Sequence, residues 1–317
     1  MKRSLWLSLI FAAVPLVAGQ LLVLNKDEAA LVFVDDSGKV TGRVPVGMGP
    51  HELVASTDGK LAFASNYGTA QSPGTTISVI DVASKKELRR VDVSPLQRPH
   101  GLAFHEGKLY FTAETNKVVG RYDPQANRID WMMGTGQGST HMVMVSRDGT
   151  RLYTANIGSD SVSILERSGN GAWNATAVPV GKGPEGMDLS PDGTQLWAAH
   201  SRDGGVSVID VATKKVVKTF DVKTKRSNRL KFTPDGKLIL ITDLEAGELV
   251  VLDAATQREV KRIAMGKSPE GILFMPRGRA LIAVNGDNFI AEFDLTTLEV
   301  KGRIQPGAGP DGMAYIE

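Results

Sequence analysis

Short runs of alternating apolar and polar residues, separated by tight turns, follow one another along the chain. Residues 228–243 (NRLKFTPDGKLILITD) are typical, with two such runs on either side of a Pro-Asp-Gly turn. An alternation of period two places successive side chains on opposite faces of a strand, and Asp and Gly accept the backbone angles of a tight reversal. The pattern therefore predicts β-hairpins.

This hairpin recurs at a nearly constant spacing of 41 to 49 residues. After each hairpin comes a third β-rich run, such as residues 206–210, then a polar turn and a fourth run, such as residues 216–222. Four antiparallel strands in a repeat of this length are typical of one blade of a β-propeller. The repeats begin at His51, His100, His141, Glu185, Asn228, Glu270 and, in truncated form, Asp311.

The two ends of the chain each carry part of one repeat. Residues 311–317 supply only an innermost strand, whereas residues 21–25, 30–35 and 39–46 match the second, third and fourth strands. We therefore expect one blade to be shared between the ends, so that an all-β, seven-bladed propeller closes and no sheet edge is left exposed. Residues 20–317 are predicted to form this single domain.

The first residues have the pattern of a secretory signal peptide. Lys2 and Arg3 precede an apolar run over residues 5–17, and small residues follow at 17–19. The run is short for a transmembrane helix and contains Pro15. We predict a signal peptide over residues 1–19, a secreted or periplasmic mature protein, and no stable membrane insertion after cleavage.

Composition removes several kinds of chemistry. The chain has no Cys, which excludes disulfides, zinc–thiolate sites, cysteine nucleophiles and covalent c-type haem attachment. Loss of Lys2 and Arg3 with the leader leaves equal numbers of basic and acidic side chains, so we expect no nucleic-acid partner. There is neither a Gly-x-Ser-x-Gly nucleophile motif nor a phosphate loop in a strand-to-helix context.

The repeats resemble the YVTN family of seven-bladed propellers. The likeness is carried by Pro-His-Gly at 99–101, Tyr-Thr-Ala-Asn at 153–156, Pro-Asp-Gly at 191–193 and Val-x-Val-Ile-Asp at 206–210. It covers the whole mature chain and implies the propeller fold. For function it is broad, because the family is similar to lactonases, surface-layer proteins and the propeller domains of haem and copper reductases.

Two sets of polar residues are predicted to meet at one mouth of the propeller, where innermost strands begin and second strands end. We call the first residues of the innermost strands the inner ring: His51, His100, His141, Glu185, Asn228, Glu270 and Asp311. We call the last residues of the second strands the outer ring: Asn25, Asn66, Glu114, Asn156, His200, Asp243 and Asn285. Asn at a strand end commonly bonds local backbone, which accounts for most of the outer ring. The inner ring varies in residue type behind a nearly constant Pro, so a local turn role does not account for it.

Candidate chemistry follows from these residue types. Imidazole is the commonest transition-metal ligand, so a divalent metal is a candidate cofactor, with His51, His100, His141, His200 and Asp311 as ligands. The candidate general acid and base are Glu185 and Glu270. The candidate ligand-binding residues are Arg98, Asn228, Arg229 and Asp243, with Arg202 and Arg226 nearby. His105 belongs to a turn on the opposite face and is expected to have no role.

Two functions remain open at this point. The first is an exported binding or scaffold protein that uses the polar mouth for a ligand or metal, favoured by the insertion at residues 68–75 on one side of the entrance. The second is a metal-dependent, lactonase-like hydrolase or lyase acting at the same mouth. A water-filled polar funnel without catalysis is the alternative to metal or catalytic use, and the fold alone does not decide between them.

Overall fold

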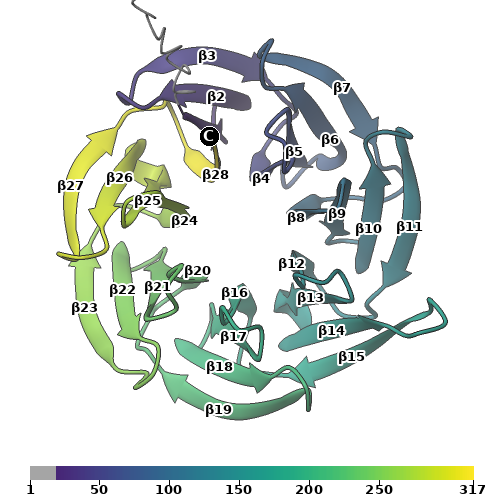
Figure 1. Ribbon diagram of the computed structural model, residues 1–317, viewed down its shortest axis with the longest axis vertical. Coiled ribbons are helices and arrows are strands. Elements are labelled where there is room, and N and C mark those ends of the chain that lie inside the picture. The colour runs from purple at the N-terminus through teal and green to yellow at the C-terminus, as the bar shows by residue number, and fades with distance from the viewer. Residues whose placement is uncertain (1–18) are drawn as a thin grey trace, which may run out of the picture.

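Seven four-stranded antiparallel sheets stand around a central axis in the computed structural model, which describes residues 19–317 (Figure 1). Apart from Gly19, the predicted signal peptide lies outside the described residues. The all-β, seven-bladed architecture predicted from the repeats is confirmed. No helix within residues 19–317 has the length and apolar character needed to cross a membrane.

The blades are numbered from the one that contains both chain ends, with strands given from the axis outwards. Blade 1 has β28 (Pro310–Ile316), β1 (Gln20–Asn25), β2 (Ala30–Asp35) and β3 (Val40–Pro45); blade 2 has β4 (Pro50–Ala55), β5 (Leu61–Gly68), β6 (Pro73–Asp81) and β7 (Lys86–Asp92); blade 3 has β8 (Pro99–His105), β9 (Lys108–Ala113), β10 (Val118–Asp123) and β11 (Arg128–Gly134). Blade 4 has β12 (Thr140–Val145), β13 (Arg151–Asn156), β14 (Ser161–Arg167) and β15 (Trp173–Pro179); blade 5 has β16 (Pro184–Leu189), β17 (Gln195–His200), β18 (Gly205–Asp210) and β19 (Lys215–Asp221). Blade 6 has β20 (Ser227–Phe232), β21 (Leu238–Asp243), β22 (Glu248–Asp253) and β23 (Glu259–Ala264); blade 7 has β24 (Pro269–Met275), β25 (Arg279–Val284), β26 (Phe289–Asp294) and β27 (Glu299–Ile304). Two short 3-10 turns, η1 (Ile157–Ser159) and η2 (Asn285–Asp287), follow β13 and β25.

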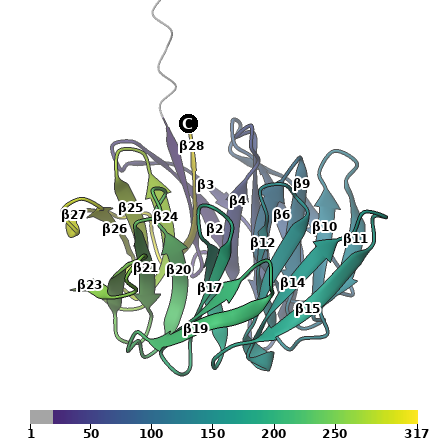
Figure 2. The ribbon, with the colours of Figure 1, turned by 60° about the horizontal axis from the view of Figure 1, so that its bottom comes forward.

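Blade 1 closes the ring by pairing the two ends of the chain. Strand β28 lies antiparallel to β1, with Ile316 opposite Gln20 and Ala314 opposite Leu22. The C-terminus consequently lies on the face opposite the mouth, which we call the far face (Figure 2). The predicted closure by a shared blade is confirmed.

The apolar core lies between neighbouring blades rather than on the axis. Trp197 of blade 5 is 1% exposed and packs in one cluster with Ile239 and Ile241 of blade 6, while Leu22 of blade 1 packs with Ala62 of blade 2. Burial of each large apolar side chain contributes about 1.5–3 kcal/mol. Because the blades bury their faces against one another, the axis is left for polar side chains.

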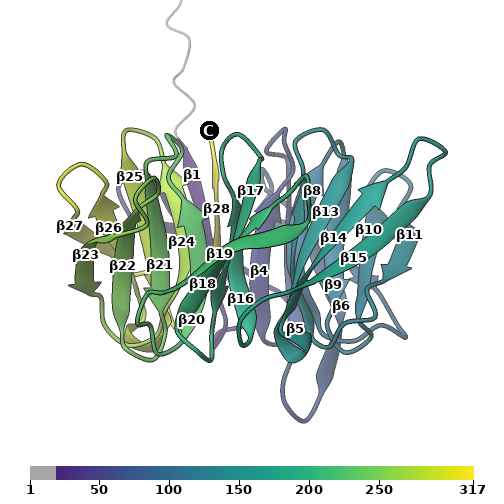
Figure 3. The ribbon, with the colours of Figure 1, turned by 90° about the horizontal axis from the view of Figure 1, so that it is seen from below.

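One hairpin projects beyond the mouth. Strands β5 and β6 are 8 and 9 residues long, longer than their counterparts in the other blades, and their hairpin extends past the neighbouring loops (Figure 3). This hairpin contains the insertion recognised at residues 68–75.

Candidate functional site

Every innermost strand contains a β-bulge directly after its first residue. In blade 2, Pro50 pairs with Asn66 and Leu53 pairs with Ala64, so three steps along β4 match two along β5. The same excess of one residue occurs in the other six blades. A bulge increases the local twist and changes the direction of a side chain, and here the first unpaired residue is the inner-ring residue in each blade. The bulges thus give the seven inner-ring residues a common setting beside the axis.

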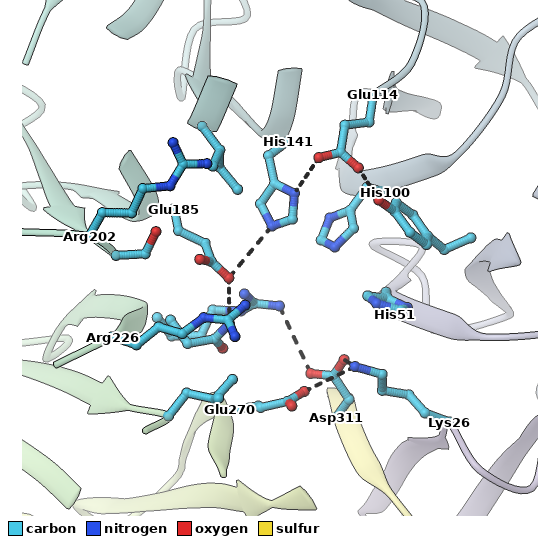
Figure 4. Close-up of a pocket in the computed structure, with 16 residues that line it drawn as sticks. Lys26, His51, His100, Glu114, His141, Glu185, Arg202, Arg226, Glu270 and Asp311 are labelled. Atoms are coloured by element: carbon cyan, nitrogen blue, oxygen red, sulfur yellow. Dashed lines mark hydrogen bonds and ion pairs between the residues drawn. The ribbon is translucent and has the colours of Figure 1, made fainter. Parts of the chain in front are cut away.

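All seven inner-ring residues line one cavity of about 430 Å³ at the mouth (Figure 4). The structure therefore brings together residues separated by up to 260 positions in the sequence. Residues that directly follow the outer ring add to the wall: Lys26, Tyr67, Ile157, Ser201 and Leu244.

The second residue of the bulge is glycine in four blades because the next blade leaves no room for a side chain. A Cβ on Gly271 would lie 2.3 Å from the carbonyl oxygen of Asp311, and one on Gly186 would lie 2.5 Å from the amide nitrogen of Leu230. Glycine thus permits the close contact between inner strands that holds the ring together. The other three blades carry Glu52, Met142 and Arg229 at this position.

Two of these exceptions meet across the axis. Arg229 of blade 6 forms an ion pair with Glu52 of blade 2, and its Nη2 also lies 3.9 Å from Oδ1 of Asp311. Burial by itself would lower the pKa of Arg229, but the carboxylates of Glu52 and Asp311 outweigh burial and raise that pKa. Because Arg229 also lines the cavity, the lining includes a buried cation.

A lysine and two carboxyl groups lie together on the side of blades 1 and 7. Nζ of Lys26 is 3.3 Å from Oε2 of Glu270 and 3.4 Å from Oδ2 of Asp311. Burial and the neighbouring Asp311 raise the pKa of Glu270 to about 8. Burial alone would also raise the pKa of Asp311, yet Lys26 and Arg229 hold it below its ordinary value. At neutral pH, Glu270 therefore keeps its proton while Asp311 is ionised.

Aromatic rings form the opposite side of the cavity. The ring centroids of His51 and Tyr67 are 4.7 Å apart, those of His51 and His100 are 5.1 Å apart, and those of His100 and His141 are 3.7 Å apart. We call these four residues the imidazole wall. Burial, followed by the charge of Lys26, lowers the pKa of His51 to about 4. Burial lowers the pKa of His100 well below its usual range, with His141 adding to the effect. Both imidazoles are therefore neutral at pH 7.

A chain of polar contacts links five consecutive blades around the cavity. The Tyr67 hydroxyl donates to Glu114, Oε1 of Glu114 lies 3.5 Å from Nδ1 of His141, and Nε2 of His141 lies 4.0 Å from Oε1 of Glu185. Asn228 then donates to Oε1 of Glu185 over 2.8 Å. Burial opposes ionisation of Glu114, but His141 and Tyr67 keep the pKa of this carboxyl below its ordinary value. Both carboxylates of this chain thus have a neighbouring donor or imidazole.

The outer ring serves local structure in nearly every blade. Asn66 accepts a hydrogen bond from the backbone N–H of Gly47 at 2.9 Å, and Asn25 donates to the carbonyl oxygen of Pro306 at 3.1 Å. Asn156 accepts from Thr140, and Asn285 donates to the carbonyl oxygen of Pro310. Of the outer ring, Glu114 is the member that lines the cavity.

Two candidate site residues lie behind the cavity wall instead of on it. Predicted as a metal ligand, His200 has its Nδ1 2.8 Å from Oδ1 of Asp203 and its Nε2 3.0 Å from Oγ of Ser207. Asp243, predicted to bind ligand, accepts hydrogen bonds from the backbone N–H groups of Lys225 and Arg226. As outer-ring residues, both bond side chains and loops of the propeller itself, which corrects the expectation that they face the mouth.

The arginines near the mouth differ in their surroundings. Arg98 stacks on Tyr67 with its Cζ 4.8 Å from the ring centroid and donates to the carbonyl oxygen of Thr69, so it braces the long hairpin outside the cavity lining. Arg202 and Arg226 do line the cavity. Neither of their guanidinium groups has a hydrogen-bond or ion-pair partner in the part of the chain that the structure describes. His105 lies at the far end of β8, outside the cavity lining, as expected.

Several buried polar atoms of the cavity residues have no hydrogen-bond partner within the described chain. They are Nδ1 of His100, Oδ1 of Asn228 and Oδ1 of Asp311, whereas Nδ1 of His141 has only its 3.5 Å contact with Glu114. Across residues 19–317, however, no group of three or more histidine, aspartate and glutamate side chains is placed so that it could hold a metal ion. A metal held by His51, His100, His141 and Asp311 remains a prediction.

Sequence reasoning did not single out Lys26, Tyr67 or Glu52. Lys26 and Tyr67 each follow an outer-ring Asn, and strand alternation places them on the side opposite to that Asn, toward the mouth. Glu52 stands where four repeats have glycine, and an acidic side chain in place of glycine was the available signal. Its partner Arg229 occupies the same position in another repeat, but nothing in the sequence identifies the two as partners.

Comparison with known proteins identifies the fold family. The model of the family described as "YNCE-like beta-propeller" matches residues 105–278. No curated protein matches the sequence significantly.

Three solved structures illustrate the likeness in fold. The periplasmic gluconolactonase of Pseudomonas aeruginosa is 18% identical with a TM-score of 0.78, covering 94% of this chain and 99% of its own. A putative 6-phosphogluconolactonase from Bacteroides fragilis is 16% identical with a TM-score of 0.78, covering 96% and 100%. A hydrazine synthase chain of Kuenenia stuttgartiensis is 18% identical with a TM-score of 0.72, covering 90% and 92%. At these identities the likeness shows the fold alone.

Proposed function

The chain belongs to the YNCE-like β-propeller family, and on that premise we propose that it is an exported binding protein that holds a small polar ligand in the axial cavity. The volume of this cavity, about 430 Å³, falls within the usual range for small-molecule sites. Polar side chains from all seven blades converge there.

The observation that carries this proposal is the set of buried polar atoms without a partner. His100 is 2% exposed and Asp311 is 1% exposed, yet Nδ1 of the first and Oδ1 of the second accept or donate no hydrogen bond within residues 19–317. Buried polar groups are nearly always satisfied in folded proteins, and leaving one unsatisfied costs about 1–3 kcal/mol. Both residues line the cavity, and a ligand would recover that energy when their side chains turn toward it, because the two atoms themselves are shielded from solvent.

Two further observations support the proposal. The leader pattern supports export, and one structural neighbour is named as periplasmic. Two neighbours are named as gluconolactonase or 6-phosphogluconolactonase, which makes sugar acids and their lactones the first compounds to test.

A thermal-shift screen of small polar compounds tests the proposal. We expect at least one sugar acid to raise the melting temperature of the mature protein, because a ligand that binds only the folded state stabilises it by mass action. The matched variants are Asp311→Asn in the cavity and Asp148→Asn on the far face. The ligand-induced shift should fall in the first variant and persist in the second. If no compound stabilises the protein, or if both variants respond alike, the cavity is not the binding site.

The second candidate is the metal-dependent, lactonase-like hydrolase or lyase. The specific observation in its favour is Glu270, whose pKa of about 8 leaves a protonated carboxyl available as a general acid. Glu185, on another blade, lines the same cavity as the candidate base. Elemental analysis of untagged mature protein and of a His100→Ala, His141→Ala variant tests this candidate. Metal bound by the first and lost from the second would support it.

A further inference from the structure

The charges in the cavity do not balance one another locally. Each cavity carboxyl group has a close partner: Asp311 and Glu270 have Lys26, Glu114 has Tyr67 and His141, and Glu185 has Asn228. The buried cation Arg229 is paired as well, with Glu52. The charged groups that remain without a partner in the described chain are the two guanidiniums, Arg202 and Arg226.

These two arginines occupy one side of the entrance. Arg202 follows β17 of blade 5, and Arg226 precedes β20 of the adjacent blade 6. Figure 4 shows both side chains on the side of the cavity opposite His51 and His100. A planar guanidinium matches carboxylate and phosphate oxygens with two parallel hydrogen bonds. An anionic group between these arginines would supply the acceptors that the protein does not.

The opposite side of the cavity favours a ring. The imidazole wall supplies aromatic side chains from blades 2 to 4; His51 and Tyr67 are partly exposed, while His100 and His141 are buried against each other. Arg98 stacks on the Tyr67 ring, and Glu114 accepts a hydrogen bond from the Tyr67 hydroxyl. His51 and His100 are uncharged at neutral pH because burial lowers their pKa. Neutral aromatic side chains offer apolar surface against which another ring can pack.

We infer that the ligand is a ring compound bearing one anionic group, a carboxylate or a phosphate, with the ring against the imidazole wall and the anion between Arg202 and Arg226. This inference rests on the proposed function and adds the class of ligand. The hydroxyl groups of a sugar ring would meet the Lys26, Glu270 and Asp311 cluster, which contains both donors and acceptors at neutral pH.

Calorimetric titration with four probes tests the inference. Glucuronate and glucose 6-phosphate combine a ring with an anion, glucose is the ring alone, and inorganic phosphate is the anion alone. We expect the better of the first two to bind about tenfold or more tightly than glucose and than phosphate, since charge-assisted hydrogen bonds contribute about 1.5–3 kcal/mol. Which of the two binds more tightly distinguishes a carboxylate from a phosphate.

Variants locate the anion. Both arginines are exposed, so an Arg202→Gln, Arg226→Gln variant should fold with an unchanged melting temperature. It should lose about tenfold or more in affinity for the anionic ring while its weak affinity for glucose stays the same. The control is Arg147→Gln, which removes an exposed arginine in the turn between β12 and β13 on the far face and should change nothing.

Three results would overturn the inference: equal affinity for glucose and the anionic rings, an unchanged affinity in the double variant, or preferential binding of cationic glucosamine. If compounds of another class bind the cavity in the thermal-shift screen, the proposed function stands and this inference fails. If no compound binds at all, both fail.

Discussion

The two ends of the innermost hairpins differ in how uniform they are. At the far face, the turns of four blades repeat the same network: a Ser or Thr hydroxyl donates to the Asp two residues later over 2.6–2.7 Å, and a glycine with φ of 66–71° follows. These pairs are Ser56 with Asp58, Ser146 with Asp148, Ser190 with Asp192, and Thr233 with Asp235. At the mouth, the corresponding inner-ring positions hold His, Glu, Asn or Asp.

The difference separates residues that shape the chain locally from residues that meet across the axis. A turn has the same backbone requirement in every blade, so one solution is repeated. At the mouth, side chains interact with partners on other blades, such as Arg229 with Glu52 or Lys26 with Glu270. Variation within an otherwise regular repeat therefore marks the site.

The largest expected effect comes from breaking the cross-axis ion pair. Arg229→Met leaves Glu52 and Asp311 without this cation in a buried setting, and we expect a loss of about 3–5 kcal/mol in the free energy of unfolding. Urea denaturation measures this loss. A Glu52→Leu, Arg229→Met double variant should recover a large part of it, since neither buried charge of the pair remains. A single variant within about 1 kcal/mol of wild type would show that the pair has no structural importance.

The next effect concerns the close contact between inner strands. Gly271→Ala places a Cβ 2.3 Å from the carbonyl oxygen of Asp311, so the two strands must separate, and we expect a loss of about 1–3 kcal/mol. The matched control is Gly169→Ala, where a Cβ would have no heavy atom within 4 Å. Both are compared by thermal or urea unfolding. Equal stability of the two variants would contradict the close packing of the ring.

A smaller effect is expected in the pH dependence of stability. An unfolded Glu ionises near pH 4.5, whereas folded Glu270 retains its proton to about pH 8, so the folded state binds more protons between these values and stability falls as the pH rises through them. His51 has the opposite shift, with a pKa of about 4, so it lowers stability only as the pH falls below about 6.5.

The variant Glu270→Gln isolates the contribution of Glu270 to the pH dependence of stability. Between pH 6.5 and 8.5, wild type should lose at least about 1.4 kcal/mol relative to Glu270→Gln, the equivalent of one pKa unit. Parallel stability curves for the two proteins across this range would mean that Glu270 is already ionised at neutral pH.

The smallest effect is expected at the far face. Ser146 donates to Asp148 and the backbone of Thr150 also donates to it, and these hydrogen bonds lower the pKa of Asp148 to about 2. Asp148→Ala removes a local, solvated network, so we expect only a slight fall in melting temperature and unchanged ligand affinity. A change in ligand affinity would show that the two ends of the hairpins are coupled.

Much of this arrangement follows from the sequence. The repeat length, the Pro-Asp-Gly turns and the divided final repeat predict the seven blades and their closure, because each depends on local pattern alone. The inner ring follows from register, since strand alternation and the repeat place seven residues at equivalent positions. The outer-ring Asn residues bond within the propeller, but their partners include a carbonyl of a loop distant in sequence for Asn25 and hydroxyl side chains for Asn156, not local backbone alone.

Which residues line the cavity and which pair across the axis depends on distances between blades, and the sequence does not give these distances. His200 and Asp243 share the outer-ring position with Glu114, and only the three-dimensional surroundings show that Glu114 lines the cavity while the other two bond within the propeller. The pairing of Arg229 with Glu52, 177 residues away, is a property of the closed ring. The order of the repeats places blades 2 and 6 on opposite sides of the ring, but it does not show which of their side chains reach across the axis.

The most direct test of the central claim is a crystal structure of the mature protein soaked with the compound that stabilises it most. The account predicts density for that compound at the axis, in contact with inner-ring residues from several blades, with its anionic group between Arg202 and Arg226. Density for the compound at the far face or on the outer strands, with the axial cavity holding only solvent, would contradict the account.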